Sequence, residues 1–260
     1  YSGGRNIDLA AYLGTDDQFG NSISLDGTRL AVGAYLDDGI SNGCGDCGAV
    51  YLFNFDDPTF NSGDLTAKIG QGYTGGKNYD AAMIDPGDWF GTAVSIDGNR
   101  LAIGSAFDDG ATNSCSACGS AYFFTFSDAM FTGAQLQSRI GSGYTGGNNL
   151  SIFLNPLDNF GFGVSLDGNR AAIGDPGSDA GGTDTGAVLL FSFADALFTA
   201  PTHQSTIANG FFTSKPVFVP TLGNSDRFGT SVALDGNRVA VGAYLDDGAS
   251  NTCTDCGAIY

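Results

Sequence analysis

Cysteine and aspartate are the residues of this chain whose types and spacing could do chemistry, and both recur in a fixed pattern. All six cysteines occur as Cys-x-x-Cys pairs, namely Cys44/Cys47, Cys115/Cys118 and Cys253/Cys256. In a further segment of similar sequence, residues 181–186 lack both cysteines of the pair. Joint loss is what a covalent bond within each pair predicts, because the loss of one cysteine alone would leave a free thiol.

Three kinds of chemistry fit a Cys-x-x-Cys pair, and the surrounding sequence favours one of them. A redox motif needs a helix amino terminus to lower the thiol pKa, whereas each of these loops leads into an apolar strand. A four-cysteine zinc site needs two pairs in contact, whereas these pairs are far apart in the sequence. We favour a disulfide within each loop, formed in an oxidising compartment, which would fasten an exposed glycine-rich loop.

Adjacent aspartates offer a second kind of chemistry, the binding of a divalent cation. Asp-Asp-Gly occurs three times, and another copy keeps a looser version with Asp175 and Asp179. The three pairs are Asp37 and Asp38, Asp108 and Asp109, and Asp246 and Asp247. Such carboxylates can be Ca²⁺ ligands, but Asp is also a turn former that accepts hydrogen bonds from the backbone. We favour the turn role and keep calcium, the one cofactor considered, as the second hypothesis.

The sequence offers no set of residues for catalysis, and we predict that the protein is not an enzyme. His203 is the only histidine, and no Ser-His-Asp combination recurs or follows a nucleophile-elbow pattern. Paired carboxylates could hydrolyse glycosidic bonds. Each aspartate is, however, one of three or four equivalent copies, which is unlike an active site, and no catalytic residue is assigned.

The composition supports a folded core but few cationic contacts. The chain has 260 residues, of which 42% are hydrophobic, so its 41 glycines do not indicate disorder. The net charge is -18, from 28 acidic and 10 basic residues. Nucleic-acid binding needs clustered Lys and Arg, so nucleic acid is not an expected partner. No apolar run reaches the roughly 18 residues of a membrane span, and none is expected.

The elements that position these residues follow from an internal repeat. The segment that begins at Phe19 returns, with few changes, at Phe90, Phe160 and Phe228. A period of this kind indicates a propeller, a solenoid or an array of one copied unit. We therefore treat residues 1–260 as one repeat array. Its units are approximately 1–72, 73–143, 144–211 and 212–260, and the last unit is incomplete.

Each unit predicts four short antiparallel strands, which in the first unit are 21–25, 29–34, 49–55 and 65–69. Asp26-Gly27 between the first two strands is a strong hairpin signal that recurs in every unit. The third strand is apolar on both faces, so it belongs to a sheet packed between neighbouring sheets. The pattern predicts an all-β protein of four-stranded, propeller-like blades, with an open stack of blades in a fibre as the alternative.

Three short stretches recur in phase in every unit. In the first unit they are Phe19-Gly20, then Val32-Gly33-Ala34, then 48–53, Gly-Ala-Val-Tyr-Leu-Phe, and corresponding letters occur in the other three units. These residues resemble the FG-GAP repeat of integrin alpha-chain propellers and related bacterial surface proteins. The resemblance implies a β-propeller of extracellular or cell-surface type.

The calcium loop of that family does not carry over. Its Asp-x-Asp-x-Asp-Gly segment lies between the first two strands of a blade, where this chain has only Leu25-Asp26-Gly27-Thr28-Arg29 and its copies. A two-residue turn is too short to supply the six to eight oxygen ligands that Ca²⁺ takes. We therefore do not expect calcium between these two strands.

The expected function is structural or adhesive. The chain begins at Tyr1 inside the repeat pattern and stops in mid-unit at Tyr260, which predicts an excerpt of a longer array with an open sheet edge. We expect an extracellular or cell-surface protein, part of a fibre or giant surface protein, whose edge strand is completed by an adjacent subunit or by continuing chain. Expected partners are copies of the chain, glycans or other surface proteins. A glycan-binding or glycan-degrading propeller is the alternative.

Overall fold

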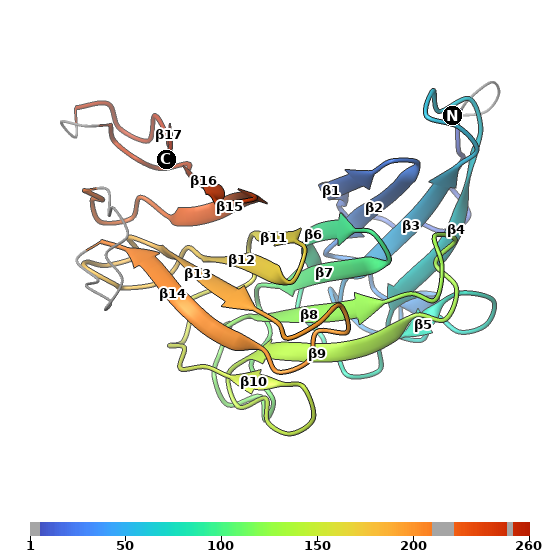
Figure 1. The fold of residues 1–260 in the computed structure, drawn as a ribbon, viewed down its shortest axis with the longest axis horizontal. Helices are drawn as coiled ribbons and strands as arrows, with labels where there is room; N and C mark the ends of the chain where they lie inside the picture. Colours follow the sequence, from blue (N-terminus) through green and yellow to red (C-terminus); the bar gives the residue numbers. More distant parts are fainter. Residues whose placement is uncertain (1–5, 210–220, 249–251) are drawn as a thin grey trace.

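The computed structural model describes residues 6–209, 221–248 and 252–260, and it consists of β-strands and loops. The one helical element in these ranges is a single 3-10 turn, η1 (Ile40–Asn42). The strands form four small sheets, ordered along the chain from blue to red in Figure 1. These sheets are the blades of a β-propeller, which confirms the predicted all-β class and the fourfold repeat.

The blades are numbered in chain order. Blade 1 contains β1 (Phe19–Asp26), β2 (Arg29–Ala34), β3 (Ala49–Phe55), β4 (Gly63–Gly70) and β5 (Tyr79–Asp80). Blade 2 contains β6 (Phe90–Asp97), β7 (Arg100–Ser105), β8 (Ser120–Thr125), β9 (Gln135–Gly141) and β10 (Leu150–Ser151). Blade 3 contains β11 (Val164–Asp167), β12 (Arg170–Asp175), β13 (Ala187–Ser192) and β14 (Thr202–Ala208). Blade 4 contains β15 (Phe228–Asp235), β16 (Arg238–Ala243) and β17 (Ala258–Ile259).

Two of the blades differ from the predicted four strands. Blades 1 and 2 each gain a two-residue strand, β5 or β10, that pairs parallel to the preceding strand. The pairing joins Tyr79 to Ile69 in blade 1 and Leu150 to Ile140 in blade 2. A strand of two residues leaves no alternating pattern in the sequence, so the prediction missed it. In blade 4 the described residues form three strands.

The hairpin between the first two strands of each blade confirms the Asp-Gly signal but shifts its centre by one residue. Asp26 pairs with Arg29 across the ladder, so Gly27 and Thr28 are the central residues of the turn. Gly27 has a φ of 62°, which a residue with a side chain rarely adopts. The shift leaves the Asp26 side chain free to bind Arg29 and the neighbouring blade.

Each blade has two faces that carry apolar side chains. We call the face that carries Phe19, Ile23 and Leu25 in blade 1, and the equivalent residues of the other blades, the leading face. The opposite face, which carries Val50 and Leu52 in blade 1, is the trailing face. The trailing faces of blades 1, 2 and 3 pack on the leading face of the next blade. The first of these cores joins Val50 and Leu52 to the blade 2 residues Phe90, Val94 and Ile96.

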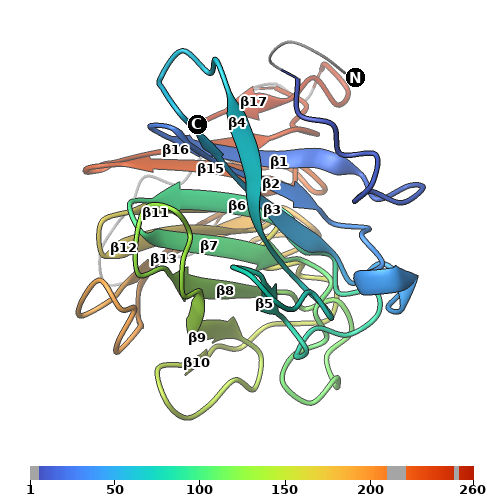
Figure 2. The same ribbon diagram turned by 90° about the vertical axis from the view of Figure 1, so that its right-hand side faces the viewer.

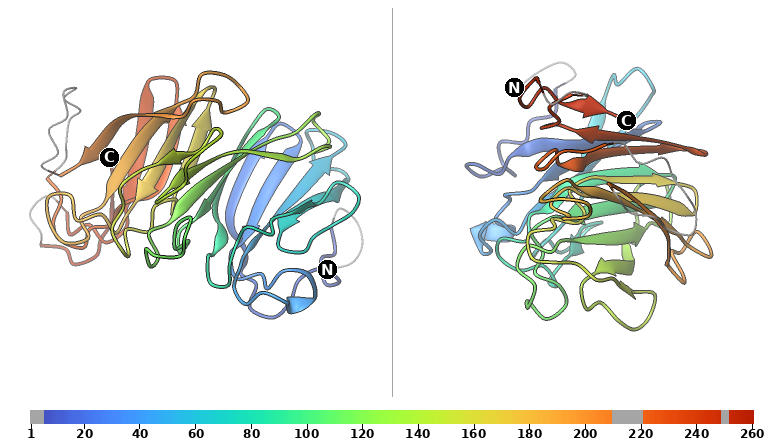
Figure 3. Two further views of the ribbon diagram at one scale, coloured as in Figure 1. Left: turned by 90° about the horizontal axis from the view of Figure 1, so that it is seen from below. Right: turned by 90° about the vertical axis from the view of Figure 1, so that its left-hand side faces the viewer.

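The blades follow one another in a row. β1 and β2 pack on β6, and β12 packs on β15 (Figure 2). Seen from below, the blades stand side by side, with the two chain ends at opposite ends of the row (Figure 3). The third strand of blades 1 and 2 is buried on both faces, as its sequence predicted.

Candidate functional site

The cysteine pairs are three disulfides within loops between the second and third strands of their blades. The bonds are Cys44–Cys47, Cys115–Cys118 and Cys253–Cys256, with Cα atoms 5.7, 5.6 and 5.7 Å apart. They confirm the predicted bond within each pair. Most of the loop is exposed in blades 1 and 2, as predicted, but Cys47 and Cys118 at its carboxyl-terminal end are fully buried.

The carboxyl-terminal end of each loop in blades 1 and 2 is buried because the next blade docks on it. The backbone N–H of Phe90 donates to the carbonyl of Cys47 at 2.8 Å, and the N–H of Phe160 donates to Cys118 at 2.9 Å. In blade 3, which has no cysteines here, Phe228 donates to Thr185 in the same way at 3.0 Å. The disulfide therefore fixes the shape of a strip of backbone that receives a neighbouring blade.

The first aspartate of each pair is buried and accepts hydrogen bonds from tyrosine, and in blades 1 and 2 these tyrosines are buried as well. We call each such group of side chains the aspartate cluster. The carboxylate of Asp108 accepts hydrogen bonds from Tyr122 Oη at 2.6 Å, from Tyr144 Oη at 2.8 Å and from Gly110 N at 2.7 Å. Burial, with the Asp108 charge adding to it, raises the pKa of Tyr122 well above its usual range. The equivalent acceptors and phenol donors are Asp37 with Tyr51 and Tyr73, and Asp246 with Tyr260.

The second aspartate of each pair supports the docking loop. Asp38 accepts a hydrogen bond from the backbone N–H of Asp46, Asp109 from Ala117 and Asp247 from Asp255, at 2.8, 2.6 and 2.8 Å. These contacts fit the turn role that the sequence favoured. Calcium at the six aspartates stays a prediction; among the described residues, no three His, Cys, Asp or Glu side chains gather closely enough to hold a metal ion.

The tyrosines of the cluster were missed by the sequence analysis. The signal was present, because Tyr51, Tyr122 and Tyr260 each follow their aspartate by 14 residues. Tyr73 and Tyr144 follow at 36 residues. Recurrent spacing of a phenol and a carboxylate could have suggested a shared hydrogen bond.

His203 is exposed on β14, and its ring lies near that of Phe191, with ring centroids 5.3 Å apart.

Replacing Tyr122 by Phe is expected to lower the free energy of unfolding by about 2 kcal/mol, because buried Asp108 loses one of its charged hydrogen bonds. Urea denaturation measures the difference. Tyr244→Phe is the control, since this ring is more than half exposed, and it is expected to leave the stability unchanged. Equal effects of the two substitutions would contradict a structural role for the cluster.

Two glycines from neighbouring blades meet where the blades pack most closely. A Cβ atom added at Gly104 would lie 1.8 Å from the carbonyl oxygen of Gly161, the glycine of the next Phe-Gly pair. The equivalent distances are 2.0 Å from Gly33 to Gly91 and 1.8 Å from Gly174 to Gly229. The glycine of each Phe-Gly pair in blades 2 to 4 therefore meets the second-strand glycine of the preceding blade in one contact between blades.

The sequence model of the FG-GAP repeat matches residues 10–53, 84–124, 155–191 and 223–260. The chain belongs to the FG-GAP repeat family. Each match includes the Phe-Gly pair and the glycine-containing strand that follows it. No curated protein matches this chain in sequence. The FG-GAP family and the propeller fold together support a repeat module of adhesive type, and its disulfides suit an extracellular protein.

An Asp–Arg pair at the hairpin turn of a blade also binds the backbone of the hairpin turn in the next blade, and we call this contact the latch. In blade 1, Arg29 Nη1 donates to the carbonyl of Gly98 in blade 2 at 2.5 Å. Asp26 Oδ2 accepts from the N–H of the same Gly98 at 2.8 Å and pairs with Arg29. The same contacts join Asp97 and Arg100 of blade 2 to Gly168 of blade 3.

The outermost faces of the row expose what the inner blades bury. On the leading face of blade 1, Ile23 and Leu25 are 68% and 53% exposed, whereas the equivalent Val94 and Ile96 are 6% and 7% exposed. Residues Ile7, Leu9 and Leu13 cover another part of that face. They leave a groove of about 440 Å³ whose lining includes Phe19, Ile23, Leu30 and Phe53.

The trailing face of blade 4 is exposed in the same sense. Ile259 is 84% exposed, whereas its equivalent Val50 is fully buried. The latch pair Asp235–Arg238 is formed at 2.6 Å, and the Arg238 side chain is 84% exposed against 12% for Arg29. One end of the row thus presents a leading face and the other a trailing face.

The single 3-10 turn of the described residues lacks the length and hydropathy of a membrane span.

Proposed function

We propose that this FG-GAP chain is an extracellular structural or adhesive repeat protein that assembles head to tail with further copies of itself. The observation that carries the proposal is the exposure of Ile23 and Leu25 on the leading face of blade 1. Burial of comparable side chains contributes about 1.5–3 kcal/mol each, so a covered leading face is favoured over an exposed one. The proposal assigns no catalytic step to the protein.

The trailing face of blade 4 supplies a matching surface. Ile259 adds an exposed apolar side chain to this face. The Asp235–Arg238 pair offers the same donor and acceptor as Arg29 and Asp26, which bind the hairpin turn of blade 2. The turn at Gly27 and Thr28 would be the element gripped in the next copy. The disulfide loop at Cys253–Cys256 would offer its backbone as the docking strip.

The charge and the disulfides support an extracellular place for such an assembly. Disulfides persist in oxidising environments and are rare in the cytosol. A net charge of -18 keeps the exposed surfaces soluble and opposes unspecific aggregation. The contact would then rest on the shape and apolar character of the two end faces rather than on general surface attraction.

Sedimentation velocity over a range of protein concentrations tests the assembly. The unmodified chain is expected to form a series of oligomers that grow with concentration. The double substitution Ile23→Asp with Leu25→Asp places charges on the leading face and is expected to give monomers. Leu197→Asp is the matched control, because Leu197 is also about half exposed, at 54%, but lies outside both end faces. It is expected to leave the oligomers unchanged.

Mixing two end variants separates head-to-tail assembly from any symmetric contact. Ile259→Asp blocks the trailing face only, so its leading face stays available. An equal mixture of this variant with the leading-face variant is expected to give dimers and no larger species. A chain that stays monomeric at every concentration, or mixed variants that form no dimer, would contradict the proposal.

A further inference from the structure

Blade 3 departs from the other blades at the position of the buried aspartate cluster. Ser178 stands at the place of Asp37 and Asp108, since its carbonyl accepts the same backbone hydrogen bond, from Gly186 N at 3.0 Å. Leu189 on β13 stands at the place of Tyr122. Blade 3 therefore lacks both the carboxylate and a phenol at the centre of the cluster.

The donors that surround the cluster in blades 1 and 2 are also replaced. Lys68 lies over the Tyr73 ring, 3.8 Å from its centroid, and Arg139 lies 4.5 Å from that of Tyr144. Thr206 on β14 stands at the place of these two cations. Phe211, at the sequence position of Tyr73 and Tyr144, lies outside the described residues, and phenylalanine has no hydroxyl to donate.

A carboxylate has nevertheless been kept nearby. Asp175 ends β12, where the other blades have Ala34, Ser105 and Ala243. Its side chain is only 3% exposed. Its Oδ1 atom is enclosed and has no hydrogen-bond partner among the described residues. Buried polar groups nearly always have a partner, so an orphaned carboxylate indicates a missing one.

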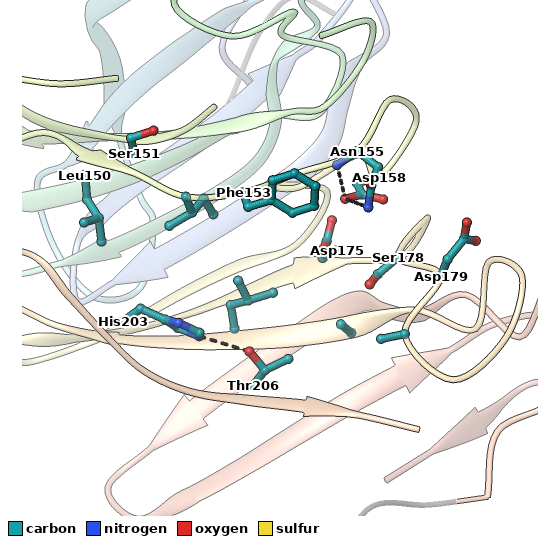
Figure 4. A pocket seen from close by; sticks show the side chains of 14 residues that line it. Leu150, Ser151, Phe153, Asn155, Asp158, Asp175, Ser178, Asp179, His203 and Thr206 are labelled. Carbon is teal, nitrogen blue, oxygen red and sulfur yellow. Dashed lines mark hydrogen bonds between the residues drawn. The ribbon is translucent and has the colours of Figure 1, made fainter. Parts of the chain in front are cut away.

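A cavity of about 640 Å³ opens where the tyrosines of the other blades would lie. Figure 4 shows Asp175 in this cavity between Phe153 and Ser178, with Asp158 on the facing loop. Leu150, Phe153 and Leu189 contribute apolar surface to its walls. None of the described residues that line it is Lys or Arg, and the one basic side chain there is His203. Burial lowers the pKa of His203, which favours its neutral form.

The electrostatics of the cavity favour a positively charged occupant. Burial raises the pKa of Asp175 well above its usual range, and the nearby charge of Asp158 adds to the effect. Burial also raises the pKa of Asp158 to about 6, although the N–H of Asn155 donates to its carboxylate at 2.6 Å. A cation with N–H donors would satisfy the orphaned oxygen and offset both effects.

We propose that the blade 3 cavity binds a primary ammonium group carried on an apolar alkyl or aryl body. The ammonium group donates to Asp175 and lies close to Asp158, and the apolar body packs along Leu150, Phe153 and Leu189. A metal ion fits less well, because among the described residues no three His, Cys, Asp or Glu side chains gather closely enough to hold one. The site is independent of the end faces and of the assembly.

Titration calorimetry on the full chain with 2-phenylethylamine tests the proposal, and 2-phenylethanol is the neutral probe of the same shape. The amine is expected to bind at one site, and the alcohol at least about tenfold more weakly, because it lacks the charge-assisted hydrogen bond. N-acetyl-lysine methylamide distinguishes a lysine side chain as the natural source from a free amine. Calcium chloride is expected to give no binding that depends on Asp175.

Two substitutions place the binding in the cavity. Asp175→Asn is expected to weaken the amine by about tenfold or more, because the charge is lost while the shape is kept. Thr206→Lys supplies a cation from within the chain, as Lys68 does in blade 1, and is expected to block the amine. Asp64→Asn is the control, since it removes an equal charge from an exposed position on β4.

The outcomes that would overturn the proposal are distinct from failure of the assembly. Equal affinity for the amine and the alcohol would show that no carboxylate is used. Unchanged amine binding by folded Asp175→Asn would place the site elsewhere. Calcium that binds the unmodified chain but not Asp175→Asn would make the cavity a metal site. The leading-face variant is expected to bind the amine like the unmodified chain.

Discussion

Replacing Gly104 by Ala is expected to destabilise the protein by about 3 kcal/mol, at the upper end of what one added methyl group costs in a packed core. The new Cβ would lie 1.8 Å from the carbonyl oxygen and 2.9 Å from the carbonyl carbon of Gly161. Both atoms belong to the backbone of the next blade, so no side-chain rotation relieves the overlap. Blades 2 and 3 would have to separate, and the core between them would loosen.

Gly242→Ala is the matched control for this effect. Gly242 has the same place in blade 4, but its added Cβ would meet only atoms of Ser231, with Oγ the nearest at 2.4 Å. That hydroxyl can rotate away, so a loss below about 1 kcal/mol is expected. Urea denaturation of both variants at low protein concentration gives the comparison. Equal losses would show that the cost arises within a blade rather than between blades.

The fold was predictable because most of its signals are local. Each hairpin is marked by Asp-Gly between apolar runs, and the repeat placed four such hairpins at equivalent positions. The third strand, for example 49–55, is apolar on both faces, which predicted that sheets pack against both sides of it. Neither inference needed knowledge of which blades are neighbours.

The contacts between blades were not predictable in the same way. The latch from Arg29 to Gly98 and the close approach of Gly104 to Gly161 join residues of different units. Their spacing equals the repeat length, so the sequence shows only that both positions recur. The sequence showed that Asp175 belongs to an irregular copy of the aspartate motif. It did not show that the Asp175 carboxylate has no partner, because this depends on β13 and β14, which have Leu189 and Thr206 in place of Tyr122 and Arg139.

The free energy of unfolding is expected to fall as the pH rises from 6 to 8, and Asp88 is expected to account for much of that slope. Burial, together with the charge of Asp108, raises the pKa of Asp88 to about 8. The unfolded side chain has a pKa of about 3.9. Between these values the folded protein holds a proton that the unfolded chain has released, so rising pH favours unfolding. One such group contributes up to about 1.4 kcal/mol for each pH unit.

Three other groups with shifted pKa values act in or near the window from pH 6 to 8, and the Asp88→Asn variant separates their contribution from that of Asp88. Asp158, whose pKa burial raises to about 6, acts in the same direction but mainly below the window. His203 acts in the opposite direction, because the partial burial of its otherwise exposed side chain at the cavity lowers its pKa, and the folded state then disfavours its charged form at acidic pH. Asp175, whose pKa burial also raises, leaves a remaining slope within the window.

Asp88→Asn is expected to flatten the slope and to make the protein more stable than the unmodified chain at pH 8. Asn keeps an oxygen that can accept the hydrogen bond from Asp85 N, which is 2.7 Å long in the unmodified chain, and it has no proton to lose. Urea denaturation at pH 6, 7 and 8 measures the slope. Asp64→Asn removes a charge from an exposed position and is expected to leave the slope unchanged. If Asp88→Asn also leaves it unchanged, Asp88 is ionised in the folded protein throughout this window, and its burial is offset by a cation that compensates the charge.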